Sequence, residues 1–309
     1  MKTWLVTGGA GFIGSHLCDA LAARGDNVRV LDDLSTGSKT NLPAGVTLTQ
    51  GDVADPEVVA RAIRGVDGCF HLAAIASVEK GVTDWLNTHR TNITGTITVL
   101  DAIRRNGSRV PVVYASSAAV YGDCKAVPIP EDADRAPLSA YGADKYSCEL
   151  HARVASHVHA IPTVGLRFFN VYGPRQDPRS PYSGVISIFC ERIAAGAPIN
   201  IFGDGRQTRD FVYVADVVAA LLAAMTLQPG HAPVFNVCTG IPTSVETLAR
   251  LIADLSGRPL DIRPQPPRSA EIRHSVGVPS LADTVLGLPP RMTLRDGLGQ
   301  VLAWLVASR

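Results

Sequence analysis

Short apolar runs alternate with helix-length amphipathic segments along the first two thirds of the chain. The runs at residues 5–6, 28–31, 46–48, 69–72, 110–114 and 163–166 are rich in β-branched side chains, which predicts strands. Residues 12–24 place apolar side chains on one helical stripe, and Asp55 before Pro56 predicts the start of a second helix over 56–64. Strands separated by helices predict a parallel sheet covered on both faces, as in a doubly wound α/β fold.

The pattern changes after residue 170. Residues 172–210 are rich in proline, glycine and arginine, and helical periodicity returns at 214–226, 244–256 and 293–307. Four prolines between residues 259 and 267 predict an extended segment there. We therefore expect a Rossmann-type domain with a doubly wound parallel sheet over residues 1–170, to which later parts of the chain return, and a smaller C-terminal α/β lobe over residues 171–309.

Composition narrows the possible partners. Of 309 residues, 46% are hydrophobic and 18% are charged, which excludes a disordered chain. The 29 Lys and Arg residues balance 28 Asp and Glu residues, so the chain lacks the basic excess expected for a nucleic-acid partner.

The longest apolar run, at 217–225, is too short to span a membrane, and the first residues resemble a strand rather than a secretory leader. Six scattered cysteines without a C-x-x-C pair predict free thiols in a reducing cytoplasm and no metal site.

A glycine-rich segment, TGGAGFIG at residues 7–14, joins the first predicted strand to the first predicted helix. Gly8 permits a tight turn, Gly11 lets the backbone approach a pyrophosphate, and Gly14 lets the helix pack on the sheet. The free N–H groups of the helix N-terminus then face the phosphates. The segment predicts a dinucleotide site, although a glycine-rich turn without a ligand has the same pattern.

Acidic residues follow the second and third predicted strands. Asp32 and Asp33 lie about 20 residues beyond the glycines, where a carboxylate accepts both ribose hydroxyls of an adenosine. Because a carboxylate there repels a 2′-phosphate, the sequence favours NAD over NADP. Asp52 ends the third strand, and its side chain either hydrogen-bonds adenine or forms the turn into the next helix.

Tyr141 and Lys145 are four residues apart, so a helix places them on one face. A phenol has a pKa of about 10, too high for a general base at neutral pH. A neighbouring ammonium and a positively charged nicotinamide ring stabilise the phenolate. Ser117 follows the strand predicted one βα unit upstream, at the edge of the sheet where such folds bind ligands. The alternative is a surface Tyr–Lys pair one helical turn apart.

Together these segments resemble the extended short-chain dehydrogenase/reductase family, and within it the NAD-dependent nucleotide-sugar epimerases related to UDP-glucose 4-epimerase. The glycine spacing, G-x-x-G-x-x-G, is typical of this branch. The resemblance covers nearly the whole chain and rests on TGGAGFIGSHL (7–17), DDLSTG (32–37), GDVAD (51–55), HLAA (71–74), TNITGT (91–96), SSAAVYG (116–122), YGADK (141–145), LRFFNVYGPRQDP (166–178), IFGDGRQTRDFVYVAD (201–216) and PPRSAEIRHSV (266–276).

The resemblance implies roles for residues at matching positions. It implies a catalytic triad of Ser117, Tyr141 and Lys145. It implies that NAD is surrounded by Gly8, Gly11, Phe12, Ile13, Gly14, Asp32, Asp33, Ser35, Gly37, Asp52, Val53, Leu72, Ala73, Ala74 and Asn92, together with Tyr141 and Lys145. It implies that a UDP-sugar meets Ser117, Tyr141, Asn170, Arg209, Arg268, Glu271 and Ser275. It also implies a homodimer, formed by the helix predicted over residues 85–103 and the helix of Tyr141, although the sequence alone allows a monomer equally well.

The residues after Ser117 separate related reactions. Dehydratases and decarboxylases that resemble this chain carry a glutamate two positions after the triad hydroxyl, whereas this chain has Ala118 and Ala119. The sequence therefore favours an enzyme that only removes and returns hydrogen at C4 of a UDP-hexose, interconverting UDP-glucose and UDP-galactose. Ser275 occupies a position where a bulky Tyr restricts relatives to plain hexoses, so N-acetylated sugars are candidate substrates as well.

Two alternatives stay open at the level of sequence. One keeps the fold and changes the sugar, as in a UDP-glucuronate or another nucleotide-sugar 4-epimerase. The other is a non-catalytic NAD-binding regulator. The intact set of Ser117, Tyr141 and Lys145 argues against the regulator, because a regulator has no need of a proton acceptor.

Overall fold

The computed structural model describes residues 1–107, 109–178, 184–227, 232–267 and 272–307. Its strands are β1 Thr3–Thr7, β2 Asn27–Asp32, β3 Thr47–Gln50, β4 Gly68–His71, β5 Val112–Ser117, β6 Thr163–Phe168, β7 Asn170–Tyr172, β8 Ile199–Phe202, β9 Thr208–Tyr213, β10 Val234–Val237, β11 Pro242–Ser244, β12 Ile262–Gln265 and β13 His274–Ser275. Its α-helices are α1 Phe12–Ala23, α2 Pro56–Ala62, α3 Val78–Thr83, α4 Trp85–His89, α5 Gly95–Arg105, α6 Ala140–His159, α7 Val185–Ala194, α8 Val214–Ala224, α9 Val245–Ser256, α10 Ser280–Leu286 and α11 Leu294–Ala307.

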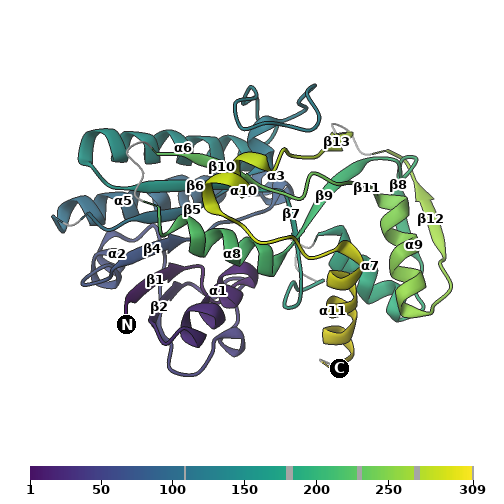
Figure 1. Ribbon diagram of the computed structural model, residues 1–309, viewed down its shortest axis with the longest axis horizontal. Helices are drawn as coiled ribbons and strands as arrows, with labels where there is room; N and C mark the ends of the chain where they lie inside the picture. Colours follow the sequence, from purple (N-terminus) through teal and green to yellow (C-terminus); the bar gives the residue numbers. More distant parts are fainter. Residues whose placement is uncertain (108, 179–183, 228–231, 268–271, 308–309) are drawn as a thin grey trace.

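Seven parallel strands form the main sheet, in the order β10-β6-β5-β4-β1-β2-β3 (Figure 1). Each of the six strands predicted from the apolar runs is present in this sheet. The order reverses between β1 and β4, which confirms the doubly wound α/β fold. In such sheets ligands bind at the carboxyl ends of the strands beside this reversal.

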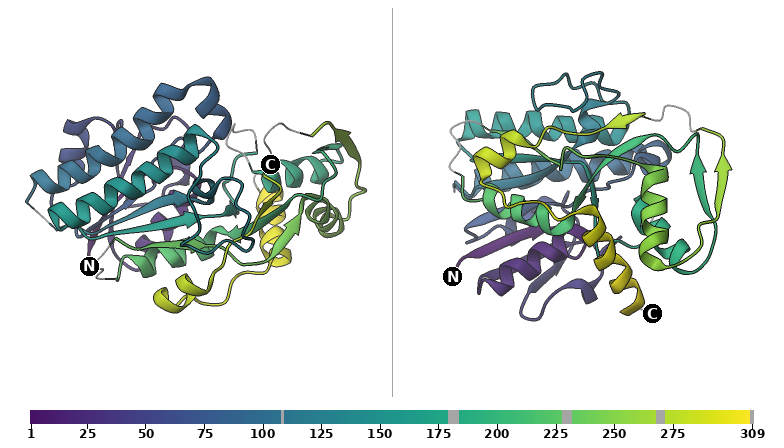
Figure 2. Two further views of the ribbon diagram at one scale, coloured as in Figure 1. Left: turned by 90° about the horizontal axis from the view of Figure 1, so that it is seen from above. Right: turned by 45° about the vertical axis from the view of Figure 1, so that its right-hand side comes forward.

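Consecutive residues of the central strands face two separate hydrophobic cores. On β1, Leu5 joins the core formed with α2, α5 and α6, whereas Val6 joins the core formed with α1 and α8. The helices of both layers are seen on either side of the sheet in Figure 2. Because both faces of the sheet centre are covered, the central strands β1 and β4 are buried at consecutive positions.

The edge strand β10 comes from the later part of the chain. It pairs with β6, with Phe235 opposite Leu166, and α8 packs beside α1 on the same sheet. The chain therefore leaves the sheet domain after β6, begins the smaller lobe, and returns through α8 and β10.

The smaller lobe is built around β9, which pairs with β7, β11 and β13, and around the parallel pair β8–β12. Helices α7, α9 and α11 pack together on one core that includes Ile193, Leu248 and Leu298. The proline-rich segment after residue 259 is extended as predicted and contains β12. Pro264 is tolerated there because β12 has a single partner strand, β8.

The helix predicted over residues 85–103 is interrupted by one irregular turn. After α4, residues Arg90–Thr94 form a π-helical turn, and α5 continues from Gly95. The hydrophobic periodicity does not predict this turn, which differs from the surrounding α-helix in having i→i+5 in place of i→i+4 hydrogen bonds. Over the described ranges, no helix is long and apolar enough to cross a membrane.

Candidate active site

A cavity of about 850 Å³ opens at the carboxyl ends of β1, β2, β4 and β5. This is the edge at which the strand order reverses. Sixteen of the residues named from the sequence line it: Gly8, Gly11, Phe12, Ile13, Gly14, Asp32, Asp33, Ser35, Val53, Leu72, Ala73, Ala74, Ser117, Tyr141, Lys145 and Asn170. The fold thus brings together segments that are far apart in sequence.

The glycine-rich turn fits a ligand that needs close contact with the backbone. Gly8 has a φ of +71°, and a Cβ on it would lie 2.7 Å from the backbone nitrogen of Ala73. A Cβ on Gly14 would lie 2.2 Å from the carbonyl oxygen of Gly8. Helix α1 begins after Gly11 without a side-chain cap, so the N–H groups of its first turn are available to an anion.

Asp32 ends β2 at the wall of the cavity. Its carboxylate accepts hydrogen bonds from the backbone N–H of Ala10 at 2.9 Å and of Leu34 at 2.8 Å. Burial raises the pKa of this carboxyl, while the two N–H donors partly offset that effect. The neighbouring Asp33 accepts from the N–H and hydroxyl of Ser35. Asp32 therefore both orders the glycine-rich turn and presents a carboxylate where the ribose of a dinucleotide is expected.

Ser117, Tyr141 and Lys145 reach the cavity from two adjacent elements. Ser117 is the last residue of β5, and Tyr141 lies in the first turn of α6. Lys145 is buried, donates a hydrogen bond from Nζ to the carbonyl of Ala115 at 2.9 Å, and holds Nζ 6.0 Å from the centre of the Tyr141 ring. A phenol with an ammonium one turn away and a hydroxyl at the adjacent strand end is an arrangement suited to proton transfer.

Close packing fixes the start of α6 against the turn that follows Ser117. Ser139 caps the helix by accepting from the N–H of Gly142 at 3.0 Å. A Cβ on Gly142 would lie 2.5 Å from the carbonyl oxygen of Ala119. The helix and the turn can approach this closely only because residue 142 is glycine.

Residues without a role predicted from the sequence also line the cavity. Arg175 and Gln176 contribute from the loop after β7, and Trp304 and Leu305 from α11. Arg175 is paired with Asp19 at 2.7 Å. The GPRQ stretch was visible in the sequence as a Pro/Gly-rich loop with a cation, but nothing local indicates that α11 returns to the cavity.

Three further predicted cofactor residues are described but stand outside the cavity lining. Asp52 forms an ion pair with Arg90 and accepts from the N–H of Ala54 in the turn after β3, and its contact with adenine stays a prediction. Gly37 packs against Ala10. Asn92 is buried and hydrogen-bonds to the backbone behind the cavity wall.

Two of the predicted substrate residues of the second lobe, Arg209 and Ser275, lie on neighbouring strands. Arg209 on β9 stands directly opposite Ser275 on β13, and neither lines the cavity described above. Buried Asp210 holds β9 in place by accepting from the backbone N–H groups of Thr239 and Gly240. Arg268 and Glu271 lie outside the described residues.

No cluster of three or more metal-ligating side chains occurs in the part of the chain that the structure describes. The doubly wound sheet, the backbone cradle at Gly8 and Gly14 and the carboxylate of Asp32 define a dinucleotide-binding α/β protein. The chain belongs to the NAD dependent epimerase/dehydratase family, whose model matches residues 4–238.

Individual proteins match over nearly the full length. The chain is 37% identical to a UDP-glucose 4-epimerase of Mycolicibacterium smegmatis, over 98% of this chain and 97% of the relative. A Thermus thermophilus UDP-glucose 4-epimerase in complex with NAD superposes with a TM-score of 0.92 at 35% identity, over 99% of this chain and 100% of the other. A UDP-N-acetylglucosamine 4-epimerase from Methanobrevibacter ruminantium, in complex with UDP-N-acetylmuramic acid, superposes with a TM-score of 0.94 at 33% identity, over 100% and 99%. NAD is therefore the cofactor, in agreement with the cradle and with Asp32.

Proposed function

We propose that the chain is a cytoplasmic UDP-sugar 4-epimerase that inverts C4 of a UDP-hexose through a transient 4-keto sugar. The observation that carries this proposal is the convergence of Ser117, Tyr141 and Lys145 with the glycine-rich turn on one cavity. Supporting it, the relatives named above are 4-epimerases. When bound, NAD supplies the redox partner that accepts and then returns the hydrogen of C4.

Each of the three side chains has a separate task in this proposal. Tyr141, as phenolate, takes the proton of the C4 hydroxyl and later gives it back. Lys145, held by the carbonyl of Ala115, keeps a positive charge beside that phenolate. Ser117 hydrogen-bonds the same sugar oxygen and so directs it toward Tyr141.

The residues after Ser117 favour epimerisation over elimination. Ala118 and Ala119 begin the short 3₁₀ turn Ala118–Tyr121 and carry no acid. Removal of a C5 proton requires a base at this place, and neither side chain can supply one. The same cavity can therefore support removal and return of hydrogen at C4 while the proton at C5 is retained.

Inversion requires the sugar to present its other face while the diphosphate stays bound. We propose that Arg209 and Arg268 hold the diphosphate, because a guanidinium matches a phosphate through two parallel hydrogen bonds. Asn170, the first residue of β7, lines the cavity and is proposed to contact the sugar diphosphate. Glu271 is proposed to accept the hydroxyls of the uridine ribose.

The sugar is proposed to be glucose or galactose, with N-acetylated sugars also admitted. The small side chain of Ser275 supports N-acetylated sugars as additional substrates. It leaves room for a larger sugar without preventing a plain hexose from binding. Fold similarity does not decide this point, since the UDP-glucose and UDP-N-acetylglucosamine epimerases above superpose almost equally well.

We also propose that two copies associate through α4 and α6. Trp85 and Leu86 on α4 are exposed, and Leu150, Val154 and Val158 form an exposed apolar stripe at four-residue intervals on α6. A second copy that covers this face would remove these side chains from water, as expected for a homodimer interface.

The decisive experiment is to incubate the purified protein separately with UDP-glucose, UDP-N-acetylglucosamine and UDP-glucuronate, and to resolve the C4 epimers by proton NMR. We expect UDP-glucose to reach an equilibrium mixture with UDP-galactose without added NAD. The Ser275→Tyr variant is expected to keep the hexose reaction and lose any N-acetyl reaction.

Other outcomes point to the alternatives. Conversion of UDP-glucuronate alone would identify a uronate epimerase. An absence of turnover on every sugar, with NAD bound, would favour the regulator.

A further inference from the structure

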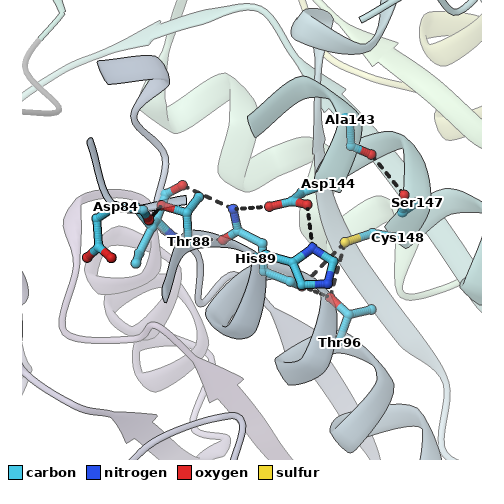
Figure 3. A network of polar contacts seen from close by, with 10 residues as sticks. Asp84, Thr88, His89, Thr96, Ala143, Asp144, Ser147 and Cys148 are labelled. Carbon is cyan, nitrogen blue, oxygen red and sulfur yellow. Dashed lines mark hydrogen bonds and ion pairs between the residues drawn. The ribbon is translucent and has the colours of Figure 1, made fainter. Parts of the chain in front are cut away.

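A buried carboxylate lies between the two ionisable residues of the active-site helix. Asp144 lies between Tyr141 and Lys145 on α6 and does not line the cavity. The residue is only 4% exposed. His89 of α4 donates from Nδ1 to its Oδ1 at 3.0 Å, and Asn92 donates from Nδ2 to its Oδ2 at 3.5 Å. Figure 3 shows Asp144 facing His89 across the gap between the two helices. One side chain therefore ties α6 to α4 and to the π-helical turn.

Asn92 carries this connection onward to the wall of the cavity. Its Oδ1 accepts from the backbone N–H of Ile75 at 2.8 Å, and its Nδ2 donates to the carbonyl of Ile75 at 3.3 Å. Residues 72–76 follow β4, and all of them line the cavity. Asp144, Asn92 and Ile75 thus form a continuous path from the back of α6 to the loop that faces the cofactor.

A second set of contacts reaches the beginning of the same loop. Thr96 donates to the carbonyl of Asn92 at 2.7 Å, so the Nε2–H of His71 must donate to Thr96, 3.0 Å away. The hydroxyl of Thr7 then donates to His71 Nδ1 at 2.8 Å and accepts from the N–H groups of Leu72 and Ala73. Thr7 of β1 thus holds the start of the loop and is linked to Thr96 through His71, whereas Asn92 of the π-helical turn holds its middle.

Packing between α5 and α6 does not depend on Asp144. Thr96 touches the thiol of Cys148 at 3.2 Å, and Val99, Ile103 and Ala152 belong to one hydrophobic core. What Asp144 adds is a contact at the end of α6 that carries Tyr141 and Lys145. Its loss is therefore expected to change the position of that end rather than to separate the helices.

We propose that Asp144 is a positioning residue that, with His89, sets the distance between the active-site face of α6 and the cofactor-lining loop 72–76. Its effect on turnover rests on the proposed epimerase function, whereas its effect on NAD binding does not. A misplacement of about 1 Å can lower a reaction rate about 100-fold when reacting groups must align, and the polar path allows Asp144 to control such a displacement.

The test compares four variants of the full-length protein, Asp144→Ala, His89→Ala, His89→Asn and Ser147→Ala. Ser147→Ala is the matched control, because Ser147 lies on the same helix and donates only to the carbonyl of Ala143 (Figure 3). His89→Asn retains a donor near the position of Nδ1 and is the conservative rescue. The readouts are the NAD dissociation rate, kcat and KM on the UDP-sugar that the wild-type protein converts, and the melting temperature.

We expect Asp144→Ala to lower kcat at least tenfold and to speed NAD dissociation by a similar factor, with KM changed less than twofold. His89→Ala should move both quantities in the same direction, His89→Asn should recover most of the loss, and Ser147→Ala should match the wild type. Values for Asp144→Ala within twofold of the control would overturn the proposal. If Asp144→Ala does not fold, His89→Ala decides, because the His89 side chain is 52% exposed and its removal opens no buried space.

The two proposals fail in different ways. A wild-type protein that converts no UDP-sugar would refute the epimerase function, and the NAD dissociation rates would still test Asp144. A wild-type epimerase whose Asp144 and His89 variants keep normal kcat and normal NAD retention would refute only the positioning role.

Discussion

Arg167 on β6 and Glu149 on α6 form a buried ion pair through two parallel hydrogen bonds, Nε to Oε1 at 2.8 Å and Nη2 to Oε2 at 2.7 Å. Ser116 also donates to Glu149, and Arg167 donates to the hydroxyl of Tyr121. Ser116 precedes Ser117 on β5, and α6 carries Tyr141. The pair therefore connects the strand end and the helix that meet at the active site.

Breaking this pair should destabilise the protein strongly. Replacement of Arg167 by Met leaves the Glu149 carboxylate buried without its cation, which costs about 3–5 kcal/mol in comparable cases. Denaturant titrations should show this loss as a lower free energy of unfolding. The dependence of that free energy on denaturant concentration should stay the same as in the wild type. The matched control is Arg104→Ala, which removes an exposed ion pair with Asp101 and should change stability by less than about 1 kcal/mol. A similar small change in both variants would contradict the prediction.

Stability should fall in acid because of His71. Burial, reinforced by the positive charge of Lys145, lowers the pKa of His71 to about 3. Below about pH 6.5 the unfolded chain takes up a proton at this residue and the folded protein does not. The free energy of unfolding should therefore decrease by up to about 1.4 kcal/mol for each pH unit between about 6.5 and 3. Urea titrations at several pH values should show a flatter dependence in His71→Gln, whereas His151→Gln, at an exposed site on α6, should behave like the wild type.

Gly14 should be essential for the cofactor site. An alanine there would place its Cβ 2.2 Å from the carbonyl of Gly8, so the glycine-rich turn must move away from α1. We expect Gly14→Ala to lose bound NAD on gel filtration and to lose about 1–3 kcal/mol of stability. Gly299→Ala, in α11, places its Cβ more than 4 Å from every described atom other than its neighbours and the backbone of its own helix, so it should retain NAD and gain about 0.5–1 kcal/mol of stability. Retention of NAD by Gly14→Ala would show that the turn tolerates a shift.

Tyr141→Phe should separate proton transfer from binding. The variant keeps the ring and removes only the hydroxyl, so we expect kcat to fall by about 10²–10⁴-fold or more while KM changes little. The NMR assay described above measures the loss, and absorbance of the purified protein checks that NAD is still present. Near-normal epimerisation by this variant would mean that another group removes the C4 proton.

The apolar stripe on α6 should control association. Val154 is 52% exposed in the single chain, so Val154→Glu should leave folding intact and convert a dimer to a monomer in sedimentation experiments. Val306→Glu, at an exposed position on α11 in the other lobe, is the control and should leave the mass unchanged. A wild-type protein that sediments as a monomer would reject the homodimer.

Local patterns predicted most of the fold and much of the cavity wall. The apolar runs place the strands of the main sheet, and the TGGAGFIG segment and Asp32 are found together because parallel strands share one carboxyl edge. The sequence also placed Tyr141 and Lys145 on one helix, and Asp55 at the start of another, where it accepts from the N–H groups of Glu57 and Val58. Each of these features depends on residues that are close in sequence.

Contacts between distant segments were not predictable in this way. Asn92 of the π-helical turn Arg90–Thr94 contacts Ile75, and nothing in the YGADK segment indicates that Asp144 contacts His89 of another helix. Nothing in α11 shows that Trp304 lines the cavity. For Asp52 the sequence allows two roles, a hydrogen bond to adenine and a turn. Its ion pair with Arg90 joins segments that are far apart in sequence, so the residues around Asp52 do not predict it.

The return of the chain through β10 has a consequence for synthesis on the ribosome. When β6 has emerged, one of its edges still lacks the strand that covers it, because β10 follows α7, β8, β9 and α8 in sequence. An uncovered strand edge is a site of mispairing between nascent chains. The main sheet can therefore be completed only after β7, β8 and β9 of the smaller lobe have left the ribosome, since β10 follows them in sequence.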